Sequence, residues 1–202
     1  MMPQIVDITA KTGQHIVDPV TSWQTPDGPF IVEHLAGRAP NGDLLVFYWS
    51  PRQDWTVVNV TNITGQRIAS PVTSWVTGNV EHLAGKGPDN SLLVFWWTPA
   101  TNWQVVNVTN ITGENVDSNP TVYQLADAQE NVELLGAKNP SNSLLLYWWK
   151  PSLDWQAMNI SEITGEQIIS TPQAWIVPSG TSSIVEHFAA ESNNNRFIGV
   201  LG

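Results

Sequence analysis

The chain repeats one unit four times, and this periodicity constrains the fold more than any other feature. The string VEHLAG begins at Val32 and returns at Val80, as VELLGA at Val132 and as VEHFAA at Val185. From each of the first three valines it is 17 residues to a tryptophan, 6 more to a second tryptophan and 10 more to a glycine. Such a repeat indicates units that bury their apolar faces against their neighbours.

Each unit holds four short stretches that predict β-strands. In the second copy they span 71–75, 79–85, 91–97 and 103–111. They are rich in β-branched and aromatic residues, the breaks between them are rich in turn formers, and no helical periodicity is evident. The run LLVFWW is apolar on both alternating faces, which indicates a strand covered on both sides. Together these features predict an all-β fold, a β-propeller of four-stranded antiparallel blades.

The two ends of the chain suggest how the blades form a ring. The copies cover about 14–65, 66–113, 114–165 and 166–202, so we expect a single propeller domain over 1–202. The fourth copy ends after its third strand, and Pro3–Thr9 aligns with the missing strand when Gly13 is set on Gly65. We therefore predict four blades per chain closed by the N-terminal strand. The alternative is an eight-bladed ring from two chains that exchange these strands.

The amino-acid composition limits the classes of binding partner that the chain can have. With 8 Lys and Arg against 18 Asp and Glu, the formal charge is −10, which makes nucleic acid and anionic membrane poor partners. The absence of cysteine excludes disulfides and thiolate chemistry. The apolar runs are too short for a membrane span, and the N-terminus lacks a signal-peptide pattern. We expect a soluble chain without a secretion signal and assign no compartment.

The repeat is similar to that of a known family. The module SPVTSW, NVEHLAGKGPDNSLLVFWW and NWQVVNVTNITG resembles the tryptophan-rich repeat of bacterial propeller lectins of the Photorhabdus type. The resemblance implies a propeller fold and recognition of fucose or a related sugar in pockets between adjacent blades. Four copies replace the seven of those lectins, and VTNITG replaces their usual ExLGG ending.

Aromatic residues supply the candidate binding site. All eleven tryptophans fall at repeat positions, and core packing accounts for most of them. A sugar site combines an aromatic platform with a few convergent polar groups. Two aromatic positions of each unit lie beside polar turns or variable loops and fit that requirement. The candidates are Trp23, Trp55, Trp75, Trp103, Tyr123, Trp155 and Trp175.

Catalytic and metal sites find no support in the sequence. Glutamate and histidine are adjacent at 33–34, 81–82 and 186–187, but adjacent strand residues point to opposite faces and cannot serve one site. Their repetition indicates structural hydrogen-bond acceptors at Glu33, Glu81, Glu133 and Glu186. Because Leu134 replaces the histidine of one copy, we predict no metal, and we expect no cofactor and no enzyme activity. The Asn-x-Ser/Thr sequences are interpreted as a polar face of the outermost strand.

The leading interpretation is a carbohydrate-binding propeller module with repeated sites. The alternative is a scaffold for a protein partner, which would use the irregular loops at 24–31, 124–131 and 176–184. An enzyme that uses the central tunnel has the least support, because no asymmetric cluster of carboxylates appears. The chain also suits a homo-oligomer.

Overall fold

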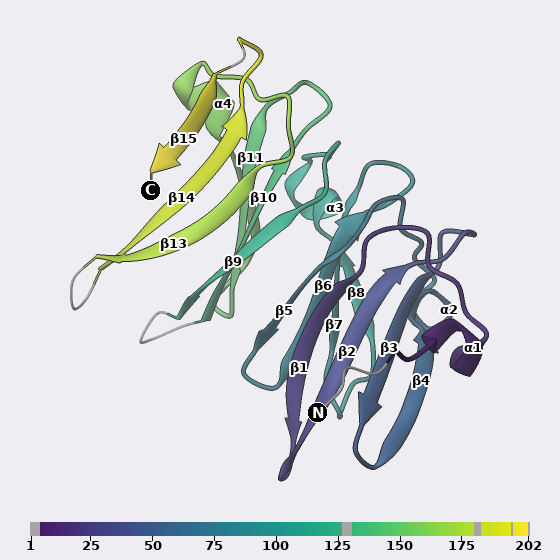
Figure 1. Cartoon of the computed structure of the whole chain (residues 1–202). Coiled ribbons are helices and arrows are strands. Elements are labelled where there is room, and N and C mark those ends of the chain that lie inside the picture. The colour runs from purple at the N-terminus through teal and green to yellow at the C-terminus, as the bar shows by residue number, and fades with distance from the viewer. Residues whose placement is uncertain (1–4, 127–130, 180–182, 195, 202) are drawn as a thin grey trace.

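The protein forms four antiparallel sheets in chain order, here called blades 1 to 4 (Figure 1). The computed structural model describes residues 5–126, 131–179, 183–194 and 196–201. Blade 1 holds β1 (Thr21–Asp27), β2 (Phe30–Arg38), β3 (Leu44–Ser50) and β4 (Gln53–Asn59). Blade 2 holds β5 (Thr73–Thr77), β6 (Val80–Lys86), β7 (Leu92–Trp97) and β8 (Gln104–Asn107). Blade 3 holds β9 (Thr121–Ala126), β10 (Asn131–Lys138), β11 (Leu144–Lys150) and β12 (Leu153–Asn159). Blade 4 holds β13 (Gln173–Ser179), β14 (Ser183–Glu191) and β15 (Phe197–Leu201). The predicted all-β fold of propeller-like blades is confirmed.

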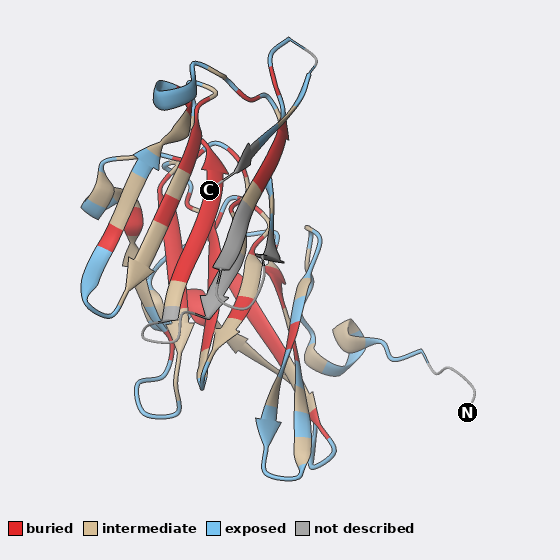
Figure 2. Ribbon diagram, turned by 90° about the vertical axis from the view of Figure 1, so that its left-hand side faces the viewer, coloured by how far each residue is buried: buried red, intermediate tan, exposed pale blue. Residues whose placement is uncertain are grey.

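The blades pack face to face. The first strands of successive blades, β1, β5, β9 and β13, contact one another in that order. Val46 of blade 1 packs in one apolar cluster with Phe95 of blade 2, and Val94 packs in the same way with Tyr147 of blade 3. Figure 2 shows the buried strands in the middle of the stack. A strand covered on both faces needs apolar residues at consecutive positions, which explains the runs in β3, β7 and β11.

A five-residue helix follows the outer strand of blades 1 to 3, which corrects the prediction of a continuous strand over 103–111. These helices are α2 (Val60–Thr64), α3 (Val108–Thr112) and α4 (Ile160–Thr164), and a helix of the same length, α1 (Ile8–Thr12), precedes blade 1. The strand before α3 ends at Asn107, whose side-chain oxygen accepts the backbone N–H of Asn110 at 3.1 Å. Gly113 ends the helix with a left-handed φ of 79°. The Asn-x-Thr sequences therefore cap helices and do not form the predicted polar strand face.

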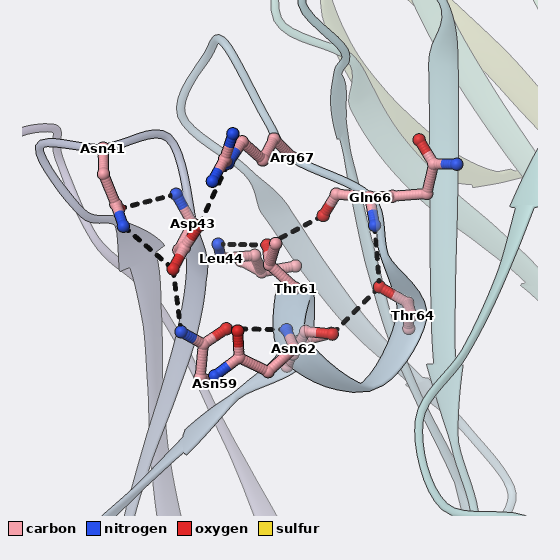
Figure 3. A network of polar contacts seen from close by, with 10 residues as sticks. Asn41, Asp43, Leu44, Asn59, Thr61, Asn62, Thr64, Gln66 and Arg67 are labelled. Atoms are coloured by element: carbon pink, nitrogen blue, oxygen red, sulfur yellow. Dashed lines mark hydrogen bonds and ion pairs between the residues drawn. The ribbon is translucent and has the colours of Figure 1, made fainter.

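A polar network fixes α2 to blade 1 (Figure 3). Asn59 donates from Nδ2 to Asp43 Oδ2 at 2.8 Å, and this bond is the largest cause of the lowered pKa of Asp43. Thr61 Oγ1 accepts the backbone N–H of Leu44 at 2.9 Å and donates to the Gln66 carbonyl at 2.7 Å. Asn59 at the end of β4 pairs with Leu45 at the start of β3, so α2 lies at the end of the blade where β3 begins. The β1–β2 and β3–β4 hairpin turns lie at the other end of the blade (Figure 1).

The predicted closing strand is not formed in the described part of the chain. Ile5–Asp7 lie in no strand, and Ile8 and Thr9 begin α1, while Pro3 and Gln4 lie outside the described residues. The alignment behind the prediction is sound, because Asp7 caps α1 as Asn59 caps α2, but the helix takes the residues that the prediction gave to the strand. Among the described residues β15 pairs with β14 alone. Because α1 and β15 lie at opposite ends of the stack (Figure 1), the sheets are not closed into a ring.

No helix within the described ranges has the length and apolar character needed to cross a membrane.

Candidate functional site

Two equivalent cavities lie between successive blades, at the hairpin end of the stack. Pocket 1–2, between blades 1 and 2, has a volume of about 600 Å³, and pocket 2–3, between blades 2 and 3, has a volume of about 450 Å³. In both, the earlier blade supplies a histidine and a large aromatic residue, and the later blade supplies a glutamate and two tryptophans. The equivalent lining residues are His34 and His82, Tyr48 and Trp96, Glu81 and Glu133, Trp97 and Trp149, and Trp103 and Trp155.

A histidine of one blade meets the glutamate of the next in each pocket. Nδ1 of His34 lies 3.5 Å from Oε2 of Glu81, and Nε2 of His82 lies 3.1 Å from Oε1 of Glu133. All four side chains are buried. The sequence analysis was right that Glu81 and His82 point to opposite faces, but it did not combine this with the stacking of identical units. Because blades 1 and 2 each carry the histidine and blades 2 and 3 each carry the glutamate, the two gaps between these blades each receive one of each kind, whereas blade 3 carries Leu134 in place of the histidine.

Stacking and hydrogen bonds hold these groups in place. The rings of Trp23 and His34 stack with centroids 5.0 Å apart, and Trp75 and His82 stack at 4.9 Å. Nε1 of Trp23 donates to Oε2 of Glu81 at 2.9 Å. Trp23 therefore fixes both the imidazole and the carboxyl group of pocket 1–2.

Burial favours the uncharged forms of the pocket groups. It lowers the pKa of His34 and of His82 to about 4, and it raises the pKa of Glu133 from 4.5 to about 7. Burial also raises the pKa of Glu81, against the opposing effect of the hydrogen bond from Trp23. Removal from water disfavours a charge on either kind of group. At neutral pH His34 and His82 are neutral and offer one donor and one acceptor each.

The candidate residues from the sequence fall into distinct places. Trp103 lines pocket 1–2 and Trp155 lines pocket 2–3, and both are buried, whereas their positions beside polar turns suggested exposure. Trp23 and Trp75 are also buried; they stack on the pocket histidines and are not among the residues that line the two pockets.

The other three candidates lie outside the two pockets. Trp55 is half-buried on the face of blade 1 that has no preceding blade. Trp175 is 44% exposed and stacks on His187 at 5.2 Å. Tyr123 lies in β9 opposite Leu134, and its side chain lies outside the described residues. As a binding set, the seven aromatic candidates stay a prediction.

Sequence reasoning missed two of the three aromatic walls of each pocket. Trp97 and Trp149, with Tyr48 and Trp96, were not among the candidates, because core packing was taken to explain most of the aromatic residues. The available signal was their position at the hairpin end of the strand, where two stacked blades leave space between them. No group of three histidine, aspartate or glutamate side chains in the described part of the chain is placed to hold a metal ion.

Comparison with known proteins supports the fold. No protein-family model matches the sequence, and no curated protein matches it. Among solved structures, the chain is similar to a fucose lectin from Kordia zhangzhouensis, solved in complex with methyl-fucoside. The TM-score is 0.55 at 22% identity, over 69% of this chain and 97% of that chain. The similarity shows a shared fold, and the Photorhabdus-type resemblance stays a prediction.

Proposed function

We propose that pocket 1–2 and pocket 2–3 each bind one sugar residue of a glycan. The observation that carries the proposal is the recurrence of one combination of groups, aromatic walls beside a buried carboxyl and imidazole, in both gaps. A sugar ring presents apolar C–H faces and hydroxyl groups, and this combination suits both. The volumes of about 450 and 600 Å³ lie in the range of small-molecule pockets.

The electrostatics favour a neutral ligand. In pocket 2–3 the walls include Trp149 and Trp155, and the polar groups include His82, Glu133 and Asp154. Burial lowers the pKa of His82 to about 4, so its imidazole is neutral at neutral pH, and it raises the pKa of Glu133 to about 7, so this carboxyl group is only partly ionised there. Sugar hydroxyls both donate and accept, so they match such groups better than a phosphate or an ammonium group does.

Calorimetric titration tests the proposal, with methyl-fucoside as the first probe because the Kordia lectin was solved with it. Methyl glycosides of other neutral sugars complete the panel. We expect at least two sites per chain, and each of Trp97→Ala and Trp149→Ala should remove one. Trp148→Ala is the matched control, because this tryptophan lies on the same strand but packs in the cluster between blades 3 and 4.

The proposal fails if no sugar of the panel binds at millimolar concentration. It also fails if a folded Trp149→Ala protein, judged by circular dichroism, keeps the full number of sites. The protein-scaffold alternative would then take its place.

A further inference from the structure

The outward face of blade 4 exposes residues that are buried at the equivalent positions of other blades. Trp175 is 44% exposed, whereas Trp23 and Trp75 are 8% and 6% exposed. Phe197 is 80% exposed, whereas the equivalent Leu44 is 0% exposed. Among the four described sheets, none packs on this face of blade 4.

The outward face of blade 1, at the other end of the stack, also exposes residues that are buried at the equivalent positions of other blades. Glu33 is exposed, whereas the equivalent Glu81 and Glu133 are buried against the preceding blade. Trp55 is half-buried, whereas the equivalent Trp103 is buried. None of the described sheets therefore covers this face of blade 1.

The two open faces carry complementary halves of a pocket. Blade 4 presents His187 stacked on Trp175, as His34 is stacked on Trp23 in pocket 1–2. Blade 1 presents Glu33 and Trp55, which are equivalent to the glutamate and a tryptophan that the later blade supplies to each internal pocket. If these two faces met, the contacts that form pocket 1–2 and pocket 2–3 would be repeated a third time between them.

The N-terminal helix points to the same contact. The helix that follows an outer strand packs on the outer strand of the next blade, as α2 does on β8 and α3 on β12. Helix α1 packs on β4, where Lys11 also pairs with Asp54. The residues before α1 thus correspond to the outer strand of a blade that precedes blade 1. Of these, Ile5 is fully exposed and Val6 is 47% exposed.

We propose that blade 1 of a second copy of this chain docks on blade 4, and that Ile5–Asp7 of that copy adds the outer strand beside β15. The contact, here called the seam, is head-to-tail, and such contacts form rings when the rotation closes. Because the two faces lie at opposite ends of one chain (Figure 1), the smallest closed ring holds two chains and eight blades. The proposal of the seam does not depend on the proposed function. Only sugar binding in a pocket at the seam would rest on the proposed function.

Disulfide trapping tests the seam, since the chain has no cysteine. Between blades 1 and 2, Oγ1 of Thr21 lies 2.6 Å from Oγ of Ser74. The equivalent positions of the seam are Gln173 and Ser22, both exposed within one chain. The double variant Ser22→Cys/Gln173→Cys should give a covalent species of twice the 22.3 kDa chain mass on a non-reducing gel, and reductant should reverse it. The control Thr21→Cys/Ser74→Cys should close its disulfide within one chain.

Three results would overturn the seam. A disulfide inside single Ser22→Cys/Gln173→Cys chains would mean that one chain closes into a four-bladed ring. Failure to cross-link while the control closes would mean that the faces do not meet. A ladder beyond two chains would exclude the two-chain ring. Sugar titrations have no bearing on these outcomes, so the seam and the proposed function can fail separately.

Light scattering gives a second measurement that needs no cross-link. The unmodified protein should have twice the chain mass, and Glu33→Arg should reduce it to the single chain with an unchanged circular dichroism spectrum. Gln104→Arg places the same charge at an exposed position of blade 2 and should keep the doubled mass. A wild-type protein of single-chain mass at all concentrations would contradict the seam.

Discussion

Replacing Glu133 by glutamine should change the free energy of unfolding more favourably at pH 8 than at pH 5. The side chain is 3% exposed, and burial raises its pKa from 4.5 to about 7. A carboxyl group with a raised folded-state pKa contributes stability that is fully present below pH 4.5 and lost as the pH rises through 7. Between pH 5 and pH 8 the wild type therefore loses about 2 to 3 kcal/mol of unfolding free energy through this group. Glutamine stays neutral and avoids that loss.

Urea unfolding at the two pH values, followed by tryptophan fluorescence, measures the effect. The difference in unfolding free energy between Glu133→Gln and wild type should shift by about 2 to 3 kcal/mol in favour of the variant from pH 5 to pH 8, or by about 5 to 10 °C in melting temperature. Any constant cost of the substitution cancels in this comparison. Glu191→Gln, at an exposed position of β14, is the control and should show no such shift. Equal effects of Glu133→Gln at both pH values would refute the raised pKa of this buried carboxyl group.

Three further predictions concern the architecture. Asn107→Ala should cost about 1 kcal/mol of unfolding free energy through loss of the helix cap, and Asn110→Ala, at an exposed position of the same helix, should cost less, both measured by urea unfolding. Phe95→Ala should cost about 3 to 5 kcal/mol, because this ring is fully buried between blades 1 and 2, and a loss below 1 kcal/mol would contradict that packing. Deletion of residues 1–7 should lower the solution mass to that of one chain, and an unchanged mass would argue against strand exchange.

The blades could be predicted from the sequence because the apolar runs and turn residues that form them are local and recur in each repeat. Consecutive apolar residues such as Val94 and Phe95 need cover on both sides of a strand, and a stack of sheets is the arrangement that provides it. The strand order within each blade follows from the short hairpin turns.

The features that sequence reasoning missed depend on contacts between units or on a single capping residue. Asn107 looks like one more polar position of a strand, and only the left-handed Gly113 behind it marks a helix. The meeting of His82 with Glu133 joins residues 51 positions apart on different blades, so no local pattern shows it. The N-terminal strand was misjudged for a related reason: its pairing partner at the end of this chain lies at the far end of the stack.

A glycan array probed with wild type and with a Trp97→Ala/Trp149→Ala double variant tests the central claim most directly. Each substitution removes one aromatic wall from one of the two pockets. We expect the wild type to bind glycans that share a terminal neutral sugar. A folded double variant should lose this signal by at least tenfold, because avidity among repeated sites amplifies the loss of each. No bound glycan for the wild type, or an unchanged pattern for the folded double variant, would contradict the claim that the gaps between the blades bind carbohydrate.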